Sequence, residues 1–489
     1  MTQCPLFQAV SQLAAVTQGL TARDLDQPWR WHAHKEGVRF ALIGTYHELR
    51  ALSIRLRTER ANRGVPFTAV HHILAHHHTA YRDLQAVLLG VPDDLPDKAP
   101  APGEWPLRRI LAHMIYTECA FYALVHGGLH TARTGTERPS LSPEYIATLI
   151  PDYEKLDAII EQPTLAPLLA FYDKLHQQIQ TRFADMTDDE LQASSLWWEG
   201  EPLPLAWRLH RFDAHLRQHT IQIEKVPAAL NVPLPEGKRH LRLVFNALAD
   251  VENATLGATE TGLLERENLA ETIRSRAAEM TAVLQQADAM VTAVQQGILD
   301  HIQALLTQNP TLVDARDPNN LPITLTATYN QRPDIAQFLV EKGARLDLYT
   351  AVAIGKLDTV QELINSGYKA VDDFNSDGFN SLQLACFFDQ EATALWLIEQ
   401  GADVNAVSQN KNSIRPVHAA AAGGNLTILS ALLAAGANPN RQQAGGFTPM
   451  HTAAQNNNPA MTALLLMHGA DPNIANDQGQ IPHECAPNR

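Results

Sequence analysis

Apolar side chains recur three and four residues apart along most of this chain, whereas the alternation typical of strands is rare. Such spacing places the apolar residues on one face of a helix, so the sequence predicts an all-α protein. In the first half it predicts four long helices, over about residues 66–89, 105–125, 142–185 and 203–226, the third broken near Pro163 and Pro167. Multi-residue loops separate them, a pattern that favours a four-helix bundle.

The apolar stripes of these helices indicate which side chains point into the bundle. The expected inward residues are Val70, Leu74, His77, Tyr81, Leu84 and Leu88 on the first helix, Leu107, Ile110, Met114 and Phe121 on the second, and Leu205, Leu209, Phe212, Leu216, His219 and Ile223 on the fourth. Two of these positions are therefore histidines.

Helical periodicity also continues on both sides of the bundle. Residues 5–20 and 34–60 predict two helices of an N-terminal extension, and two more helices follow the bundle within residues 229–288. We expect these last two to brace the bundle or to bridge to the next domain.

The last third of the chain repeats one pattern. Gly-Ala followed by Asp, Asn or Arg ends a leucine-rich helical run at Gly343, Gly401, Gly436 and Gly469, and 35 and then 33 residues separate the last three copies. A period near 33 residues predicts a solenoid of stacked units. Gly436 and Gly469 stand where a helix must end in a left-handed conformation.

The repeated units resemble ankyrin repeats. The resemblance rests on segments such as FTPMHTAAQNNNPAMTALLLMHGADPN and is strongest over residues 409–476. It implies about six units over residues 289–489, the last one truncated, and a protein partner. We expect His418 and His451, which share one position of the repeat, to make structural hydrogen bonds between units.

One histidine pattern is the main candidate for chemistry. His215 and His219 are four residues apart on the fourth bundle helix, so both rings lie on one face, and His113 on the second helix neighbours inward residues. Three histidines can hold a transition metal and leave coordination positions open. Two other pairs share the four-residue spacing: we expect His72–His76 to face water or a neighbouring surface, and His126–His130, which encloses two glycines, to lie in a loop.

A wider pattern accompanies these histidines. Trp105 begins a helix that carries ILAH up to His113, a WxGxPL turn runs from Trp198 to Leu203, and the HxxxH helix follows. The pattern resembles the DinB-like family of metal-dependent four-helix bundles over residues 63–228. The resemblance implies His113, His215 and His219 as ligands of a divalent Zn, Ni, Fe or Mn ion. Members of that family include S-transferases and isomerases that use bacillithiol, mycothiol or glutathione, so a low-molecular-weight thiol is a second implied cofactor.

Other polar residues near the proposed ligands have two interpretations each. His77 is a core histidine or a fourth ligand, and Glu118 orients a ligand or is a solvated carboxylate. Cys119 is expected to be a small core residue. The arginines are expected either to form surface ion pairs or to hold the carboxylates of a thiol cofactor; they are Arg108, Arg109, Arg211 and Arg217.

Composition narrows the classes of partner. A formal net charge of −15 argues against nucleic acid, because phosphate contacts need clustered Lys and Arg. Four widely spaced cysteines form no C-x-x-C motif and fit a reducing compartment. We predict neither a signal peptide nor a membrane span, and therefore a cytoplasmic protein. Dinucleotide, P-loop, zincin and serine-hydrolase motifs are missing from the sequence.

The sequence thus predicts four parts: a helical extension (1–62), a DinB-like bundle (63–228), a helical connector (229–288) and ankyrin repeats (289–489). Two functions stay open. The bundle is a metal-dependent enzyme, a thiol-dependent S-transferase or a hydrolase acting on a small electrophile, with repeats that bind a protein. Alternatively, the chain is an interaction scaffold whose metal is structural or vestigial. A homodimer formed through the bundle is also open.

Overall fold

The computed structural model describes residues 5–137, 140–197, 200–367 and 370–486. These residues form two compact units. The first comprises the described residues up to Leu25 together with Trp29–Ala282, and the second comprises Asp26–Pro28 and the residues from Val283 onward. Each unit is mostly helical, as the sequence predicts.

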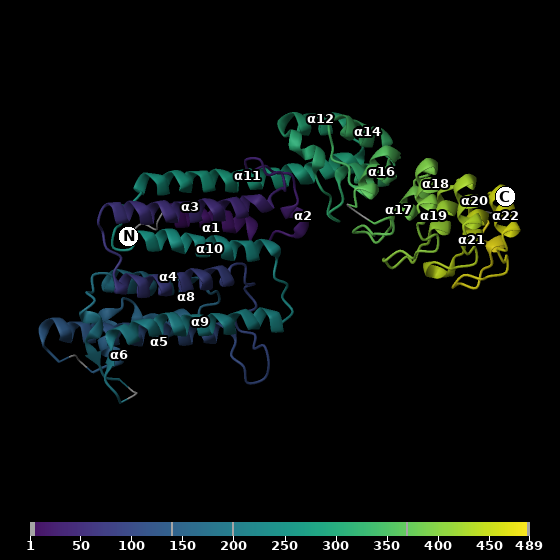
Figure 1. Cartoon of the computed structure of the whole chain (residues 1–489). Helices are drawn as coiled ribbons and strands as arrows, with labels where there is room; N and C mark the ends of the chain where they lie inside the picture. The colour runs from purple at the N-terminus through teal and green to yellow at the C-terminus, as the bar shows by residue number, and fades with distance from the viewer. Residues whose placement is uncertain (1–4, 138–139, 198–199, 368–369, 487–489) are drawn as a thin grey trace. The chain divides into compact units, whose positions relative to one another are not determined.

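A four-helix bundle forms one layer of the first unit (Figure 1). Its helices are α4 (Ala69–Leu88), α5 (Leu107–Thr134), α8 (Ala166–Phe183) and α9 (Leu205–Ala229), and α4 and α5 each pack against both α8 and α9. The apolar stripes expected from the sequence form one core. Each apolar residue expected to point inward is at most 8% exposed. The periodicity thus identified the buried face of each long helix correctly.

Short elements connect the bundle helices. The third predicted helix is divided into α6 (Pro143–Leu149), η1 (Tyr153–Lys155), α7 (Leu156–Ile160) and α8, which has Pro167 in its first turn, where the missing N–H costs nothing. Before α9, η2 (Glu190–Gln192) leads into a two-stranded antiparallel ribbon of β1 (Ser194–Ser195) and β2 (Leu203–Pro204), in which Ser195 pairs with Leu203.

The prediction of a loop around His126–His130 is wrong, because these residues continue α5. Glycine costs about 1 kcal/mol in a helix interior, but packing outweighs this here. A Cβ atom on Gly128 would lie 2.7 Å from Leu205 Cδ2, so the glycine lets α5 and the start of α9 approach closely. The helix ends at Gly135, whose φ of 71° is the left-handed conformation of a helix C-terminus.

The segments on either side of the bundle pack together as a second helical layer (Figure 1). It contains α1 (Pro5–Thr17), α2 (Ala22–Leu25), α3 (Arg39–Asn62), α10 (Glu236–Ala254) and the first part of α11 (Leu263–Gln296). Helix α10 packs against α1, α3 and α4, so it joins this layer to the bundle. Arg276 on α11 donates to Glu48 and Thr45 on α3.

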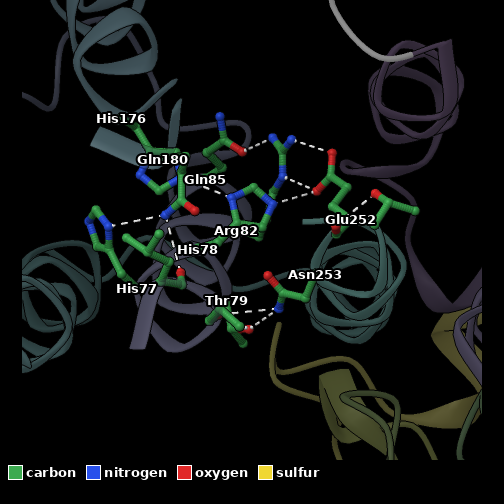
Figure 2. A network of polar contacts seen from close by, with 12 residues as sticks. His77, His78, Thr79, Arg82, Gln85, His176, Gln180, Glu252 and Asn253 are labelled. Atoms are coloured by element: carbon green, nitrogen blue, oxygen red, sulfur yellow. Dashed lines mark hydrogen bonds and ion pairs between the residues drawn. The ribbon is translucent and has the colours of Figure 1, made fainter. Parts of the chain in front are cut away.

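A buried polar network crosses the junction between α4, α8 and α10 (Figure 2). The carboxylate of Glu252 on α10 accepts hydrogen bonds from Arg82 at 2.6 and 2.8 Å and from His78 Nε2 at 2.7 Å. His78 Nδ1 lies 2.9 Å from His176 Nε2 on α8. Burial would raise the pKa of Glu252, but the attraction of Arg82 and His78 outweighs it and lowers that pKa to about 2.

The second unit is a stack of helix pairs. It begins with the end of α11, α12 (Leu299–Gln308) and η3 (Pro310–Asp314). The pairs are α13 (Ile323–Tyr329) with α14 (Pro333–Glu341), α15 (Leu348–Ala353) with α16 (Leu357–Asn365), α17 (Ser381–Phe387) with α18 (Glu391–Glu399), α19 (Pro416–Gly423) with α20 (Leu426–Ala434), and α21 (Pro449–Gln455) with α22 (Pro459–Met467). The first helices pack against one another in sequence order. A turn, η4 (Ala444–Gly446), precedes α21, and η5 (Pro482–Cys485) packs on α21 at the end.

Hydrogen bonds between neighbouring pairs explain the repeated sequence pattern. Asn405 donates to the carbonyl of Gly436 and accepts from the amide of Asn438, and Asn440 bonds Gly469 and Asp471 in the same way. These asparagines end the GADVN and GANPN segments, so their spacing is the repeat period.

The two repeat histidines have the structural role that we expected. His418 Nε2 bonds the carbonyl of Arg441 at 2.8 Å, and His451 Nε2 bonds that of Gln480 at 3.1 Å. Burial lowers the pKa of His418 to about 4, so its ring stays neutral at ordinary pH. Each ring thus fastens its own pair of helices to the turn of the next.

We predict that Glu252→Gln destabilises the first unit by about 3 kcal/mol, because it leaves the buried Arg82 without its carboxylate. The measurement is urea unfolding followed by tryptophan fluorescence, since six of the seven tryptophans precede residue 283. The control is Glu265→Gln, which removes an exposed pair with Arg55 and should cost less than about 1 kcal/mol. Equal losses for the two variants would contradict the role given to the Glu252 network.

Candidate metal centre

Two helices of the bundle bring three histidines together. His113 lies in the first half of α5 between the core side chains Ile110 and Met114. His215 and His219 lie one turn apart on the inward face of α9. Because α5 packs directly against α9, all three rings meet between these two helices.

The nitrogen atoms of the three rings are close enough for one ion. One ligand atom from each ring can be chosen so that all lie within 4.8 Å of one another, and His113 Nε2 is 3.3 Å from His215 Nε2. Within the described residues, no other three His, Cys, Asp or Glu side chains meet this condition.

The donor set fits a divalent transition metal. Nitrogen ligands at 2.0–2.1 Å from a tetrahedral ion are separated from each other by roughly 3.4 Å, close to the 3.3 Å between His113 and His215. Imidazole is a ligand that suits zinc, iron and nickel alike, so the set does not select one of them. The three histidines can therefore hold a metal, whose identity the geometry leaves open.

Burial favours the neutral form of two of the three rings, His215 and His113. His215 and His219 are 9% and 6% exposed, while His113 is half-buried. Burial, followed by repulsion from His219, His113 and Arg211, lowers the pKa of His215 to about 3. Burial also lowers the pKa of His113, with a smaller effect of His219. Neutral imidazoles offer the lone pairs that a metal needs.

A neighbouring amide orients one of the rings. Gln222 Oε1 lies 2.7 Å from His219 Nδ1, which as an N–H donates to it and leaves Nε2 free to bind. The three-residue spacing on α9 could have revealed Gln222, which sequence reasoning missed. The ring of Trp105 lies edge-on to His113, with centroids 5.4 Å apart.

A groove of about 360 Å³ reaches the triad at His219. Its walls combine apolar and polar side chains. The lining residues are Pro100, Gly103, Glu104, Trp105, Ile110, His219, Gln222, Lys225 and Val226. A small molecule in this groove would therefore meet an imidazole of the triad, an indole and an amine.

Two regions of the chain match known protein families. Residues 76–223 match the DinB superfamily, and residues 406–476 match ankyrin repeats in three copies. The chain carries a DinB superfamily domain followed by ankyrin repeats. The DinB domain thus extends from α4 to α9 and contains all three histidines.

A relative in a fungus matches part of the chain. Over 158 residues, or 30% of this chain, the sequence is 30% identical to the Ankyrin repeat protein nuc-2 of Neurospora crassa. The match covers 14% of that protein's own length. In the described helices of our chain, none is both long and apolar enough to cross a membrane.

Among the other polar residues of the DinB domain, Glu118 departs from one of its two expected roles, whereas His77 and Cys119 lie in the core as expected. Glu118 is fully buried and accepts a hydrogen bond from Tyr172 at 2.7 Å, so the solvated interpretation is wrong. Its second oxygen faces His77 Nε2 at 3.6 Å rather than a triad ring. His77 is 1% exposed and lies outside the triad's group of ligand atoms, which favours the core interpretation. Cys119 is a buried core residue, and burial raises its thiol pKa.

The arginines also correct the expectation, since only Arg217 forms a surface pair, with Asp213. Arg108 is buried; it binds Asp97 through two nitrogens and donates to three carbonyls of residues 160–163. Arg109 lies over the ring of Trp105, and Arg211 lies beside aromatic rings of the bundle. His72 and His76 are exposed, as expected. Trp198, part of the sequence pattern, lies outside the described residues.

Proposed function

We propose that the DinB domain binds one divalent transition metal through His113, His215 and His219. The observation that carries the proposal is the convergence of three imidazoles at the end of an open groove. The spacing of the nitrogens and the hydrogen bond from His219 to Gln222 support it.

The chemistry that suits this site is activation of a thiol. A divalent ion held by three neutral imidazoles keeps its full charge and, at an open position, favours ionisation of a thiol or of water. The ionised sulfur would form a bond to a carbon electrophile, whose leaving group departs with the electron pair. Family resemblance favours a low-molecular-weight thiol over water, and hydrolysis is the competing reaction.

The groove supplies contacts for such a thiol. Trp105, Ile110 and Val226 give apolar surface, and Lys225 gives an ammonium group that can pair with a carboxylate. The chain's own residues thus bind and orient the thiol beside His219. The groove is open to solvent, so a released proton has a direct path to water.

We propose that the ankyrin repeats bind a protein. Stacked repeats present an extended concave surface made by the first helices of successive pairs. Phe387, at the end of α17, is half exposed on that series of helices. The formal net charge of −15 for the chain makes a nucleic acid an unsuitable partner.

The metal assignment predicts a graded loss of affinity. His215→Ala or His219→Ala removes a ligand and should weaken zinc binding by more than about 100-fold. Gln222→Ala removes only the hydrogen bond that orients the His219 ring and should weaken zinc binding about tenfold. The measurement is competition with a chromophoric chelator on the full chain. His72→Ala, an exposed histidine of the same bundle, is the control. Loss of zinc in that variant but not in His215→Ala would show that the ligands are misassigned.

The chemical proposal predicts dependence on both metal and thiol. Metal-loaded protein should convert small electrophiles with stoichiometric consumption of added glutathione, bacillithiol or mycothiol, and His219→Ala should abolish it. Hydrolysis would proceed at the same rate without thiol. If the metal-loaded protein transforms neither electrophiles nor esters, and chelation leaves partner binding unchanged, the chain is a scaffold.

The proposal of a protein partner predicts that a charge introduced on a first helix weakens binding, whereas a charge on a second helix does not. Phe387→Asp, on a first helix, should weaken binding of a captured protein by about 2 kcal/mol, or roughly thirtyfold. Met467→Asp is the control, because Met467 is 83% exposed at the end of α22, a second helix. The assay is affinity capture by the full chain with quantitative mass spectrometry. Partners that are lost equally from both variants would contradict binding through the first helices.

A further inference from the structure

A second cavity lies where the bundle meets the second helical layer. It has a volume of about 630 Å³ and is bounded by the segment after α1, the end of α4, the end of α9 and the start of α10. None of its lining residues lines the groove at His219. It is therefore a separate site, and its size falls within the range of about 300–1,000 Å³ that is usual for small-molecule sites.

Most of the cavity wall is apolar, for reasons that the sequence makes clear. The chain turns three times around it, and prolines stand at two of these turns, Pro92 after α4 and Pro233 with Pro235 between α9 and α10. The apolar lining residues are Ala86, Val87, Leu89, Val91, Pro92, Pro227, Ala228, Val232, Pro233, Leu234 and Pro235. Leu234 is 52% exposed although the layer around it is well packed, so apolar surface is left open at the mouth.

Two cationic side chains at one end of the cavity lack an ion-pair partner among the described residues. Lys238 and Arg239 line the wall in the first turns of α10, and neither side chain makes a hydrogen bond or ion pair within the described residues. The third cation of the wall differs, because Arg242 is already bound by Asp83 and Glu224. Burial lowers the pKa of Lys238, an effect that Glu224 partly opposes. An anion close to its amine would recover the interactions that burial removes.

We propose that this cavity binds a monocarboxylate with an aliphatic chain, its carboxylate at Lys238 and Arg239 and its chain along the apolar wall. The positive charges of Lys238 and Arg239 favour a negatively charged ligand. The apolar wall formed by the prolines, Leu89 and Leu234 favours a ligand with a hydrocarbon chain. Two charges on the ligand would be unfavourable, because the carboxylate of Glu224 lies on the same wall. The start of α10 adds amide dipoles that favour a negative group.

The test is isothermal titration of the full chain with sodium decanoate below its micellar concentration. Decanoate should bind saturably at one site per chain. Lys238→Met, which keeps the aliphatic stem and removes the charge, should weaken binding at least tenfold. Ala228→Trp, an exposed position that would fill the cavity, should weaken it by the same factor or more. Lys174→Met, an exposed lysine of α8 outside the cavity, should change nothing.

Ligands of different charge make the test decisive. Decyltrimethylammonium carries the same chain with the opposite charge and should bind at least tenfold more weakly than decanoate, and inorganic phosphate should not bind. The proposal is overturned if decanoate does not saturate, if the cation binds as tightly, or if both substituted proteins bind like the parent chain. Circular dichroism identifies a variant that fails to fold, and the comparison of ligands on the parent chain then decides.

Discussion

Helix α4 is buried on two sides, and the first unit depends on this double burial. It packs against α8 and α9 within the DinB domain and against α10 of the second layer. Polar groups on the two buried sides of the helix cannot reach water, so they need partners inside the protein. Arg82 and His78 find theirs in Glu252 of α10. The second layer thus supplies the carboxylate that compensates an arginine of the bundle itself.

Burial lowers the pKa of an imidazole both at His78 and at the histidine triad. The pKa of His215 is lowered because the ring is buried beside two other imidazoles, and the repulsion from Arg211 acts in the same direction. At His78, the buried imidazole instead has Glu252 as its direct neighbour. Both ring nitrogens of His78 are occupied, by His176 and Glu252, whereas one nitrogen from each triad ring lies within 4.8 Å of the other two. That difference, and not the number of histidines, distinguishes a structural cluster from a candidate metal centre.

In the repeats, function and stability are assigned to different side chains. His418, His451, Asn405 and Asn440 are all occupied by bonds to the next pair of helices. These residues account for much of the repeated pattern, and they leave no free donor set for catalysis. In the proposed protein binding, recognition would fall to side chains such as Phe387 that vary from one unit to the next, and a regular sequence pattern therefore identifies the fold but not the partner.

Local sequence determined a large part of this protein. Helical periodicity gave the buried faces of α4, α5 and α9, and the four-residue spacing of His215 and His219 placed both rings on one inward face, since these features depend only on the pitch of a helix. Only the tertiary structure decided the rest. At Gly128, inside α5, a Cβ atom would lie 2.7 Å from Leu205 Cδ2, and the pairing of Glu252 with Arg82 joins residues 170 positions apart. The burial of Glu118 and the cavity at Lys238 likewise arise where separate segments meet. Periodicity cannot encode such features, because it records which face of a helix is apolar and not which neighbour will cover it.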